Sequence, residues 1–116
     1  MLKLLHKLLF SVSFIYAQPQ SHTFTINNET RQYYLYTPDS LGQGVPLLFV
    51  LHGYSGSAVS IMNYSNMNQI ADENGFVVCY PQGVLDDIGN AFWNVGYDFH
   101  PNETVDDVEF LSALAH

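Results

Sequence analysis

Residues 46–56 have the composition that chemistry at a strand end requires. Six apolar residues, 46–51, run into His52, Gly53, Tyr54, Ser55 and Gly56. An apolar run of this length, bounded by proline and glycine, predicts a strand buried on both faces in the middle of a sheet. In α/β sheets, ligands bind just beyond the carboxyl ends of such strands. Glycines at that position would let the backbone bend sharply and approach a ligand closely.

The chemistry that fits this loop is stabilisation of a transient negative oxygen. In hydrolases with a strand-mounted serine nucleophile, one oxyanion-hole N–H group comes from a loop of this kind. We expect the backbone N–H of Tyr54, together with that of Gly53, to point at the oxyanion. His52 is expected to hold the loop by hydrogen bonding rather than to act as a base. The alternative is a plain strand-to-helix turn that needs glycine for its geometry.

Ser55 lies in a sequence that is close to a nucleophile motif. Residues 53–57 (Gly-Tyr-Ser-Gly-Ser) fall one residue short of G-x-S-x-G. A triad built on Ser55 would need an acid and then a histidine, and His100 and His116 could supply only the histidine. The sequence therefore favours a loop role for Ser55 over a nucleophilic one.

Two residues of a later loop are candidates for substrate binding. Trp93 and Asn94 lie in a long segment without periodicity, where an aromatic residue can line the acyl or aryl side of a cleft. Anchoring of Trp93 to the core is an equally good alternative, so both interpretations stay open.

Several carboxylates could be interpreted as metal ligands. Asp106 and Asp107, with the aspartates at 86, 87 or 98, could form an oxygen site. The position of the first two at a helix N-terminus explains them without a metal, because carboxylates stabilise that end of a helix. His100 has no second histidine at ligand spacing and is expected at the surface. We therefore expect no metal and no cofactor.

Composition limits the classes of partner. The chain has 116 residues, enough for one domain, and a formal net charge of −8 with three basic residues, Lys3, Lys7 and Arg31. A surface this acidic repels phosphate backbones and offers no basic patch for anionic lipid. We therefore expect neither nucleic-acid nor membrane binding. The single cysteine, Cys79, lies in an apolar stretch and is expected to be buried.

The N-terminus has the layout of a secretory signal. Lys3 and Lys7 precede a short apolar segment, and Ala17 follows as a small residue at an expected cleavage site. Residues 1–17 are therefore predicted to be a signal peptide, and the mature chain is expected to be secreted, extracellular or periplasmic.

The remaining pattern predicts alternating strands and helices. Strands at 22–27 and 31–37, joined by Asn27-Asn28, predict an antiparallel hairpin. The strand at 46–51, a helix at 64–74 closed by Gly75 and a strand at 76–80 predict a parallel crossover unit. A long loop at 82–103 then leads to a helix at 104–116, with Thr104 and Asp107 as a shortened capping box.

Six short segments also match one pattern in order. They are Arg31-x-Tyr33-x-Leu35-Tyr36-x-Pro38, Leu51-His52-Gly53-Tyr54-x-Gly56, Ile70 to Val78, Tyr80-Pro81-Gln82-Gly83, Trp93-Asn94-Val95-Gly96 and Val105-Asp106-Asp107-Val108-x-Phe110-Leu111. Over residues 31–114 the chain thereby resembles secreted esterases of the polyhydroxybutyrate depolymerase-like, feruloyl and acetylxylan esterase group.

This resemblance implies an α/β-hydrolase fold with a mostly parallel sheet, an antiparallel N-terminal hairpin and a cofactor-free Ser-Asp-His triad. The implied substrates are esters of plant-polysaccharide side chains or of polyester. Residues 18–116 are then expected to be the N-terminal portion of the domain and to end before the nucleophile elbow. No catalytic serine, acid or histidine is therefore assigned. The chain alone is expected to be inactive. The alternative is a secreted, non-catalytic carbohydrate-binding or pseudoenzyme domain on the same scaffold.

Overall fold

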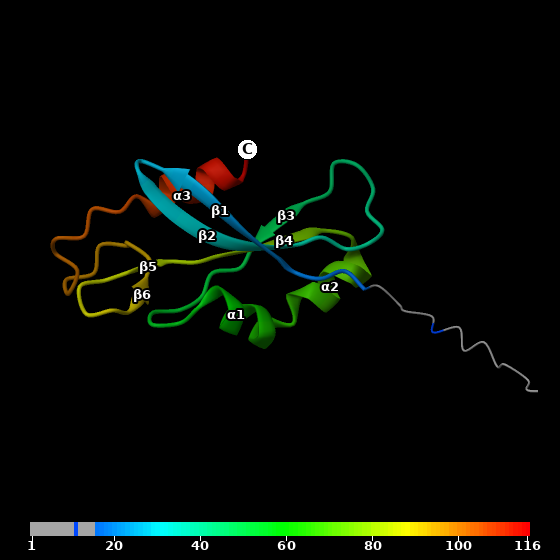
Figure 1. The fold of residues 1–116 in the computed structure, drawn as a ribbon, viewed down its shortest axis with the longest axis horizontal. Coiled ribbons are helices and arrows are strands. Elements are labelled where there is room, and N and C mark those ends of the chain that lie inside the picture. The colour runs from blue at the N-terminus through cyan, green and yellow to red at the C-terminus, as the bar shows by residue number, and fades with distance from the viewer. Residues whose placement is uncertain (1–10, 12–15) are drawn as a thin grey trace, which may run out of the picture.

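A computed structural model describes Ser11 and residues 16–116, so the signal peptide predicted at 1–17 falls almost wholly outside the described residues. The elements, in chain order, are β1 (Gln20–Ile26), β2 (Glu29–Tyr36), β3 (Leu47–Phe49), α1 (Ala58–Ser65), α2 (Met67–Asn74), β4 (Val77–Pro81), β5 (Val84–Leu85), β6 (Ala91–Phe92) and α3 (Asp107–Leu114) (Figure 1). None of the helices in this described part is long and apolar enough to span a bilayer.

The N-terminal hairpin is confirmed. β1 and β2 pair antiparallel from Gln20–Leu35 to Ile26–Glu29. Asn27 and Asn28 have φ angles of 50° and 63°, and two adjacent residues in the left-handed region form the tight turn that matches the twist of a hairpin. Asparagine tolerates this region better than most residues do, so the two asparagines explain the position of the turn.

The four-stranded sheet has the order β1-β2-β4-β3. β3 and β4 are parallel and are joined by α1 and α2, which confirms the crossover unit. β2 pairs with β4 antiparallel, as it does with β1. The expectation of a mostly parallel sheet is therefore wrong for the described chain, which has a mixed α/β sheet.

β3 differs from its prediction in both length and position. It covers Leu47–Phe49 rather than 46–51, although the Val50 N–H still donates to the carbonyl of Cys79 at 2.9 Å. Among the described strands β4 is its one neighbour, so β3 lies at the edge of the described sheet. Leu47 and Leu48 are 39% and 38% exposed. The expected burial on both faces is wrong here, because no described element covers this edge.

The predicted helix at 64–74 is two helices. Asn66 adopts a left-handed conformation (φ 56°) between α1 and α2, which ends the first helix. α1 starts earlier than expected because the Ser57 side chain accepts a hydrogen bond from the N–H of Ser60 at 3.1 Å. Gly75 ends α2 with φ 75°, as predicted.

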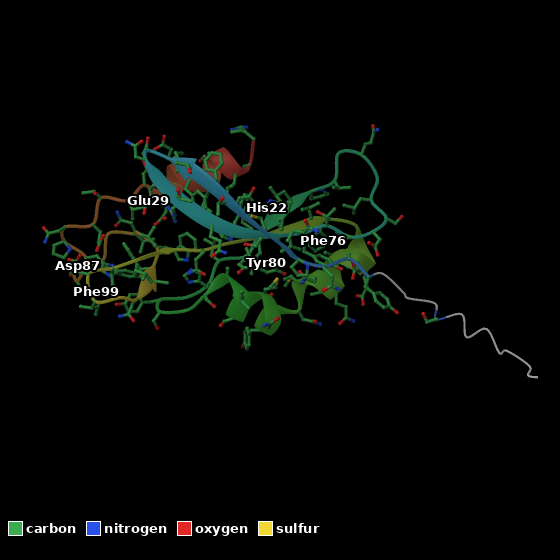
Figure 2. The ribbon with its side chains drawn as sticks, in the orientation of Figure 1. His22, Glu29, Phe76, Tyr80, Asp87 and Phe99 are labelled. Carbon is green, nitrogen blue, oxygen red and sulfur yellow. The ribbon has the colours of Figure 1, made fainter. Side chains whose placement is uncertain are left out.

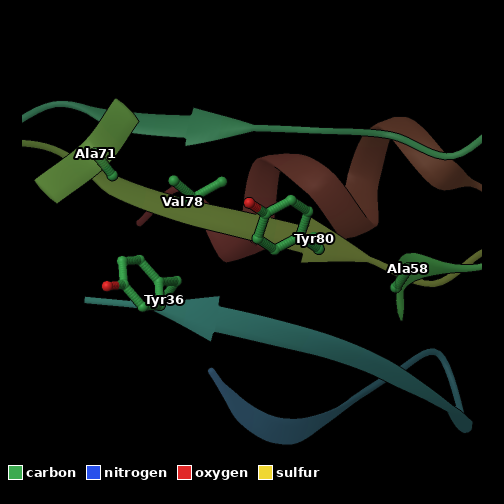
Figure 3. Close-up of a cluster of buried hydrophobic side chains, with 5 residues drawn as sticks. All are labelled: Tyr36, Ala58, Ala71, Val78 and Tyr80. Atoms are coloured by element: carbon green, nitrogen blue, oxygen red, sulfur yellow. The ribbon is translucent and has the colours of Figure 1, made fainter. Parts of the chain in front are cut away.

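The helices cover opposite faces of the sheet. α1 and α2 lie on one face and α3 on the other (Figures 1 and 3). Because side chains alternate along a strand, the even-numbered residues Tyr36, Val78 and Tyr80 meet Ala58 and Ala71 in a buried cluster (Figure 3). The odd-numbered Arg31 lies on the opposite face, against α3.

Burial raises the pKa of two side chains of the sheet, Tyr36 in this cluster and Cys79 in β4. The Tyr36 hydroxyl donates to the carboxylate of Asp72 at 2.7 Å. Burial, followed by the hydrogen bond to Asp72 and its negative charge, raises the pKa of Tyr36 to about 12. Cys79 is 2% exposed, as expected, and burial raises the pKa of its thiol to about 12.

The segment at 82–103 is more ordered than its sequence indicated. β5 and β6 pair antiparallel within it and form a second, small sheet. α3 then begins at Asp107, not at Thr104. Asp106 is its N-cap and accepts from the N–H of Glu109 at 2.8 Å. The predicted pairing of Thr104 with Asp107 in a capping box is therefore wrong, whereas a capping role is confirmed for Asp106.

Candidate functional site

In the loop after β3, the backbone N–H groups of the four residues 51–54 have no hydrogen-bond acceptor among the described residues. The Ser55 N–H donates to the carbonyl of Ala91 at 2.8 Å, and the Gly56 N–H donates to that of Gly53 at 3.0 Å. The N–H groups of Gly53 and Tyr54 have no hydrogen-bond acceptor among the described residues. A backbone N–H without a protein acceptor is satisfied by water or by a ligand.

The buried ring of His52 holds this loop by hydrogen bonds to Gly53 and Gly83. It is 3% exposed, and its Nε2 accepts a hydrogen bond from the N–H of Gly83 at 2.9 Å. Nε2 must therefore be unprotonated, so the ring proton is on Nδ1 and is donated to the carbonyl of Gly53 at 2.7 Å. A histidine used in this way holds the loop, as the sequence predicted for His52.

Gly83 is required where it contacts this ring. A Cβ added at Gly83 would overlap the carbonyl oxygen of Phe92 and would lie 3.2 Å from Cε1 of His52. At Gly53, by contrast, an added Cβ would meet no atom within 4 Å. The space around the Cα of Gly53 is thus open, whereas the space at Gly83 is filled by the Phe92 carbonyl and the His52 ring.

The side chain of Tyr54 is anchored by a carboxylate. Its hydroxyl donates to Oδ2 of Asp86 at 2.7 Å and accepts from the side-chain amide of Asn90 at 3.1 Å. The bond to Asp86 is the main cause that raises the pKa of Tyr54. Oδ1 of Asp86 accepts from the backbone N–H groups of Ile88 and Asn90 at 3.1 and 2.8 Å.

His100 completes this arrangement, and its expected surface location is wrong. It is 8% exposed, and its Nε2 donates to Oδ2 of Asp86 at 3.0 Å. Its ring packs against those of Phe92 and Phe99, each with a centroid distance of 4.4 Å. Burial alone would raise the pKa of Asp86, but the hydrogen bonds from Tyr54, Asn90, His100 and Ile88 outweigh burial and hold it below its usual range.

A groove of about 150 Å³ lies beside this cluster, lined among others by Tyr54, Asp86, Phe99, His100 and Glu103. Asp87, which also lines the groove, and Phe99 lie at the end of the molecule that carries β5 and β6 (Figure 2). Aromatic rings and carboxylates line the groove, a composition suited to a small ligand rather than to an anion.

Trp93 and Asn94 have structural partners. The Trp93 indole N–H donates to the carbonyl of His52 at 2.8 Å. The Asn94 side chain donates to the carbonyls of Glu103 and Val105 at 3.2 and 2.9 Å. The indole thus joins the later loop to the candidate oxyanion loop, and substrate contact by either residue remains a prediction.

Asp107 has a different role from its neighbour Asp106. Its carboxylate pairs with the guanidinium of Arg31 at 2.7 Å, with both side chains buried, and accepts from the N–H of Asn94 at 2.6 Å. The guanidinium also lies 4.1 Å from the centroid of the Phe110 ring. In the described part of the chain, no group of three or more His, Cys, Asp or Glu residues could hold a metal ion.

Ser55 has no triad geometry in the described structure. It is exposed, its φ is 58°, and no hydrogen bond joins its hydroxyl to a histidine or a carboxylate of the described residues. The arrangement agrees with a turn role.

Asp86, Gln82 and Gly83 support the loop but were not predicted to do so. Gln82 accepts from the N–H of Ala58 at 2.9 Å through its side-chain oxygen. The sequence signal for Gln82 and Gly83 was their position directly after a buried strand. For Asp86 the sequence offered only a double aspartate, which does not identify a partner at position 54.

Comparisons with known proteins relate part of the chain to esterases. It is 36% identical over 58 residues to feruloyl esterase B of Thermothelomyces thermophilus, covering 50% of this chain and 20% of that enzyme. It is also 36% identical over 95 residues to the candidate esterase NocK of Nocardia uniformis subsp. tsuyamanensis, covering 77% of this chain and 26% of that protein. The chain therefore spans about a fifth to a quarter of the length of these relatives. No protein-family model matches the chain.

Proposed function

We propose that this chain forms the oxyanion-stabilising part of a secreted serine carboxylesterase with an α/β-hydrolase fold. The observation that carries the proposal is the loop at 51–54, whose N–H groups have no acceptor among the described residues. Those of Gly53 and Tyr54 lie in the part of the loop that is held by the His52 ring and by the bond from Ser55 to Ala91. Partial similarity to two esterases supports the same reaction. The nucleophile, acid and base of the triad are proposed to lie outside these residues.

The proposed chemistry is acyl transfer. When a serine attacks an ester carbonyl, negative charge develops on the carbonyl oxygen, and two fixed amide donors stabilise that charge. Because the loop is held in place by His52, Trp93 and Ala91 before substrate arrives, its donors need little reorganisation in the transition state. No metal or redox group is needed for this reaction.

The proposed substrates are feruloyl or acetyl esters of plant-polysaccharide side chains, or polyester of the hydroxybutyrate type. The exposed rings of Tyr97 and Phe99, stacked with centroids 4.9 Å apart, would suit the flat face of a sugar or aryl group. The same surface favours the alternative of a non-catalytic carbohydrate-binding domain.

A covalent probe separates these two functions. The full-length protein that carries this sequence is treated with a fluorophosphonate and assayed on aryl, acetyl and hydroxybutyrate esters. For an esterase we expect stoichiometric labelling of one serine and loss of ester hydrolysis in proportion to labelling. Binding of xylan fragments without labelling and without hydrolysis would contradict the esterase and support the binding domain.

A further inference from the structure

The candidate oxyanion loop is joined to the β5–β6 hairpin at two points. One is the backbone bond from the Ser55 N–H to the Ala91 carbonyl at 2.8 Å. The other is the Tyr54 hydroxyl, which donates to Asp86 at 2.7 Å and accepts from the side-chain amide of Asn90 at 3.1 Å. One contact holds the side chain of Tyr54 and the other holds the backbone of the next residue, Ser55. The hairpin therefore determines how firmly the Tyr54 N–H, which has no acceptor among the described residues, is held.

Asp86 is itself held rigidly. Its side chain is 3% exposed, and both carboxylate oxygens accept two hydrogen bonds. Its backbone also pairs with Asn90 and accepts from the N–H of Gly89. A carboxylate with all of these bonds cannot rotate without losing several of them at once, and each such charge-assisted bond is stronger than a neutral one.

His100 provides the fourth bond and the apolar wall. It donates to Asp86 while its ring lies between those of Phe92 and Phe99. The ring of Tyr54 packs edge-on against Phe99 with a centroid distance of 5.6 Å. The Tyr54 side chain is therefore held by a hydrogen bond at its tip and by ring contacts along its length.

We propose that Asp86 is a positioning residue for the oxyanion donor: by fixing the Tyr54 phenol, it fixes the backbone N–H of the same residue. A tyrosine held at both the ring and the hydroxyl has little freedom at its own backbone torsions. The donor is thereby aimed before the substrate arrives, which is the condition for strong electrostatic stabilisation of a transition state. This inference rests on the proposed function, because the oxyanion is that of the proposed esterase.

The kinetic test uses Tyr54→Phe, Asp86→Asn and the double variant in the full-length protein. Tyr54→Phe removes only the hydroxyl. For each single variant we expect kcat to fall about tenfold, because a displaced donor weakens transition-state binding, with KM changed by less than about twofold. The double variant is expected to be about as slow as the slower single one, because both changes break the same bond.

The matched control is the Tyr36–Asp72 pair, a bond of the same type at 2.7 Å in the buried cluster of β2 and α2. Tyr36→Phe should lower the unfolding temperature and leave kcat unchanged. Unchanged kcat in Tyr54→Phe, or multiplicative effects in the double variant, would overturn the assignment of Asp86.

A second readout needs no activity. In 15N-labelled protein, Tyr54→Phe and Asp86→Asn should lower the heteronuclear NOE of the amide at position 54, whereas Tyr36→Phe should not. An unchanged NOE at position 54 would overturn the positioning role. If the wild-type protein neither hydrolyses esters nor reacts with the fluorophosphonate, the proposed esterase fails, and the NOE still decides whether Asp86 orders the Tyr54 amide.

Discussion

At the scale of single residues, the two glycines around His52 have opposite requirements. Gly53 faces open space, and Gly83 is enclosed by the Phe92 carbonyl and the His52 ring. Gly53 leaves open space that a ligand could enter, whereas Gly83 leaves space that the Phe92 carbonyl and the His52 ring occupy. Glycine at both positions looks the same in the sequence.

This contrast gives a paired prediction. Gly83→Ala should destabilise the protein by about 1–3 kcal/mol, because the added methyl group overpacks a filled site. Gly53→Ala should change the free energy of unfolding by less than about 0.5 kcal/mol and still lower kcat/KM, because its Cβ would crowd the carbonyl of a bound ester. Urea unfolding and ester assays on both variants measure these effects. Equal destabilisation by the two changes would contradict the steric argument.

Adjacent aspartates offer a second comparison at this scale. Asp106→Ala removes an N-cap and should cost about 1 kcal/mol. Asp107→Ala leaves Arg31 buried without its carboxylate and should cost about 3–5 kcal/mol. Urea unfolding of the two variants separates these values. A cost for Asp107→Ala no larger than that for Asp106→Ala would show that the buried pair contributes little.

At the scale of elements, the cluster between the sheet and α1–α2 contains ionisable groups that must stay neutral. Tyr36 in β2 has a folded-state pKa of about 12, whereas an exposed tyrosine titrates near 10. A raised pKa means that its contribution to stability is complete below pH 10 and is lost as the pH rises towards 12.

The prediction is therefore a loss of stability at alkaline pH. In the wild-type protein the free energy of unfolding should decrease between about pH 10 and pH 12. The free energy of unfolding of Tyr36→Phe should decrease less over that range. A residual slope remains, because burial also raises the pKa of Cys79 to about 12 and raises that of Tyr80. Denaturant titrations at fixed pH values measure both slopes. Identical slopes would contradict the raised pKa of Tyr36.

The elements also show which predictions local chemistry can support. Three features that depend on neighbouring residues were predicted: the Asn27-Asn28 turn, the Gly75 cap and the apolar strand, which was expected at 76–80 and is observed at 77–81. The break at Asn66 was not, because the apolar spacing continues through it. The Asp86–His100 bond joins residues 14 apart around the β5–β6 hairpin, and neither spacing nor residue type indicated it.

At the scale of the whole molecule, the position of β3 limited prediction most. An apolar run predicts burial but does not determine which strands lie beside it. Here β4 is the one strand beside β3 in the described chain. Leu47 and Leu48 of β3 are exposed because no described strand lies along its other edge. The position of the loop that follows β3 was nevertheless predicted from the sequence, because the His-Gly pair after an apolar run is a local feature, and its role as an oxyanion loop stays a prediction.

Charge is the other whole-molecule property that bears on substrate. Arg31 is the only Lys or Arg in the described residues, and it is buried in its ion pair. The described surface thus lacks a lysine or arginine, so for the proposed esterase we expect a neutral ester to bind better than a strongly anionic one.

The central claim is that the Tyr54 backbone N–H donates to the oxyanion. It is tested most directly by replacing Tyr54 with its α-hydroxy-acid analogue in the full-length protein, which exchanges this one N–H for an ester oxygen and keeps the side chain. The corresponding α-hydroxy-acid replacement at Gln43, an exposed residue whose N–H has no acceptor among the described residues, is the control. We expect kcat to fall by about 10²–10³ for the replacement at position 54 and to stay within about twofold for the replacement at position 43. An unchanged kcat at position 54, with the fold intact, would contradict the account.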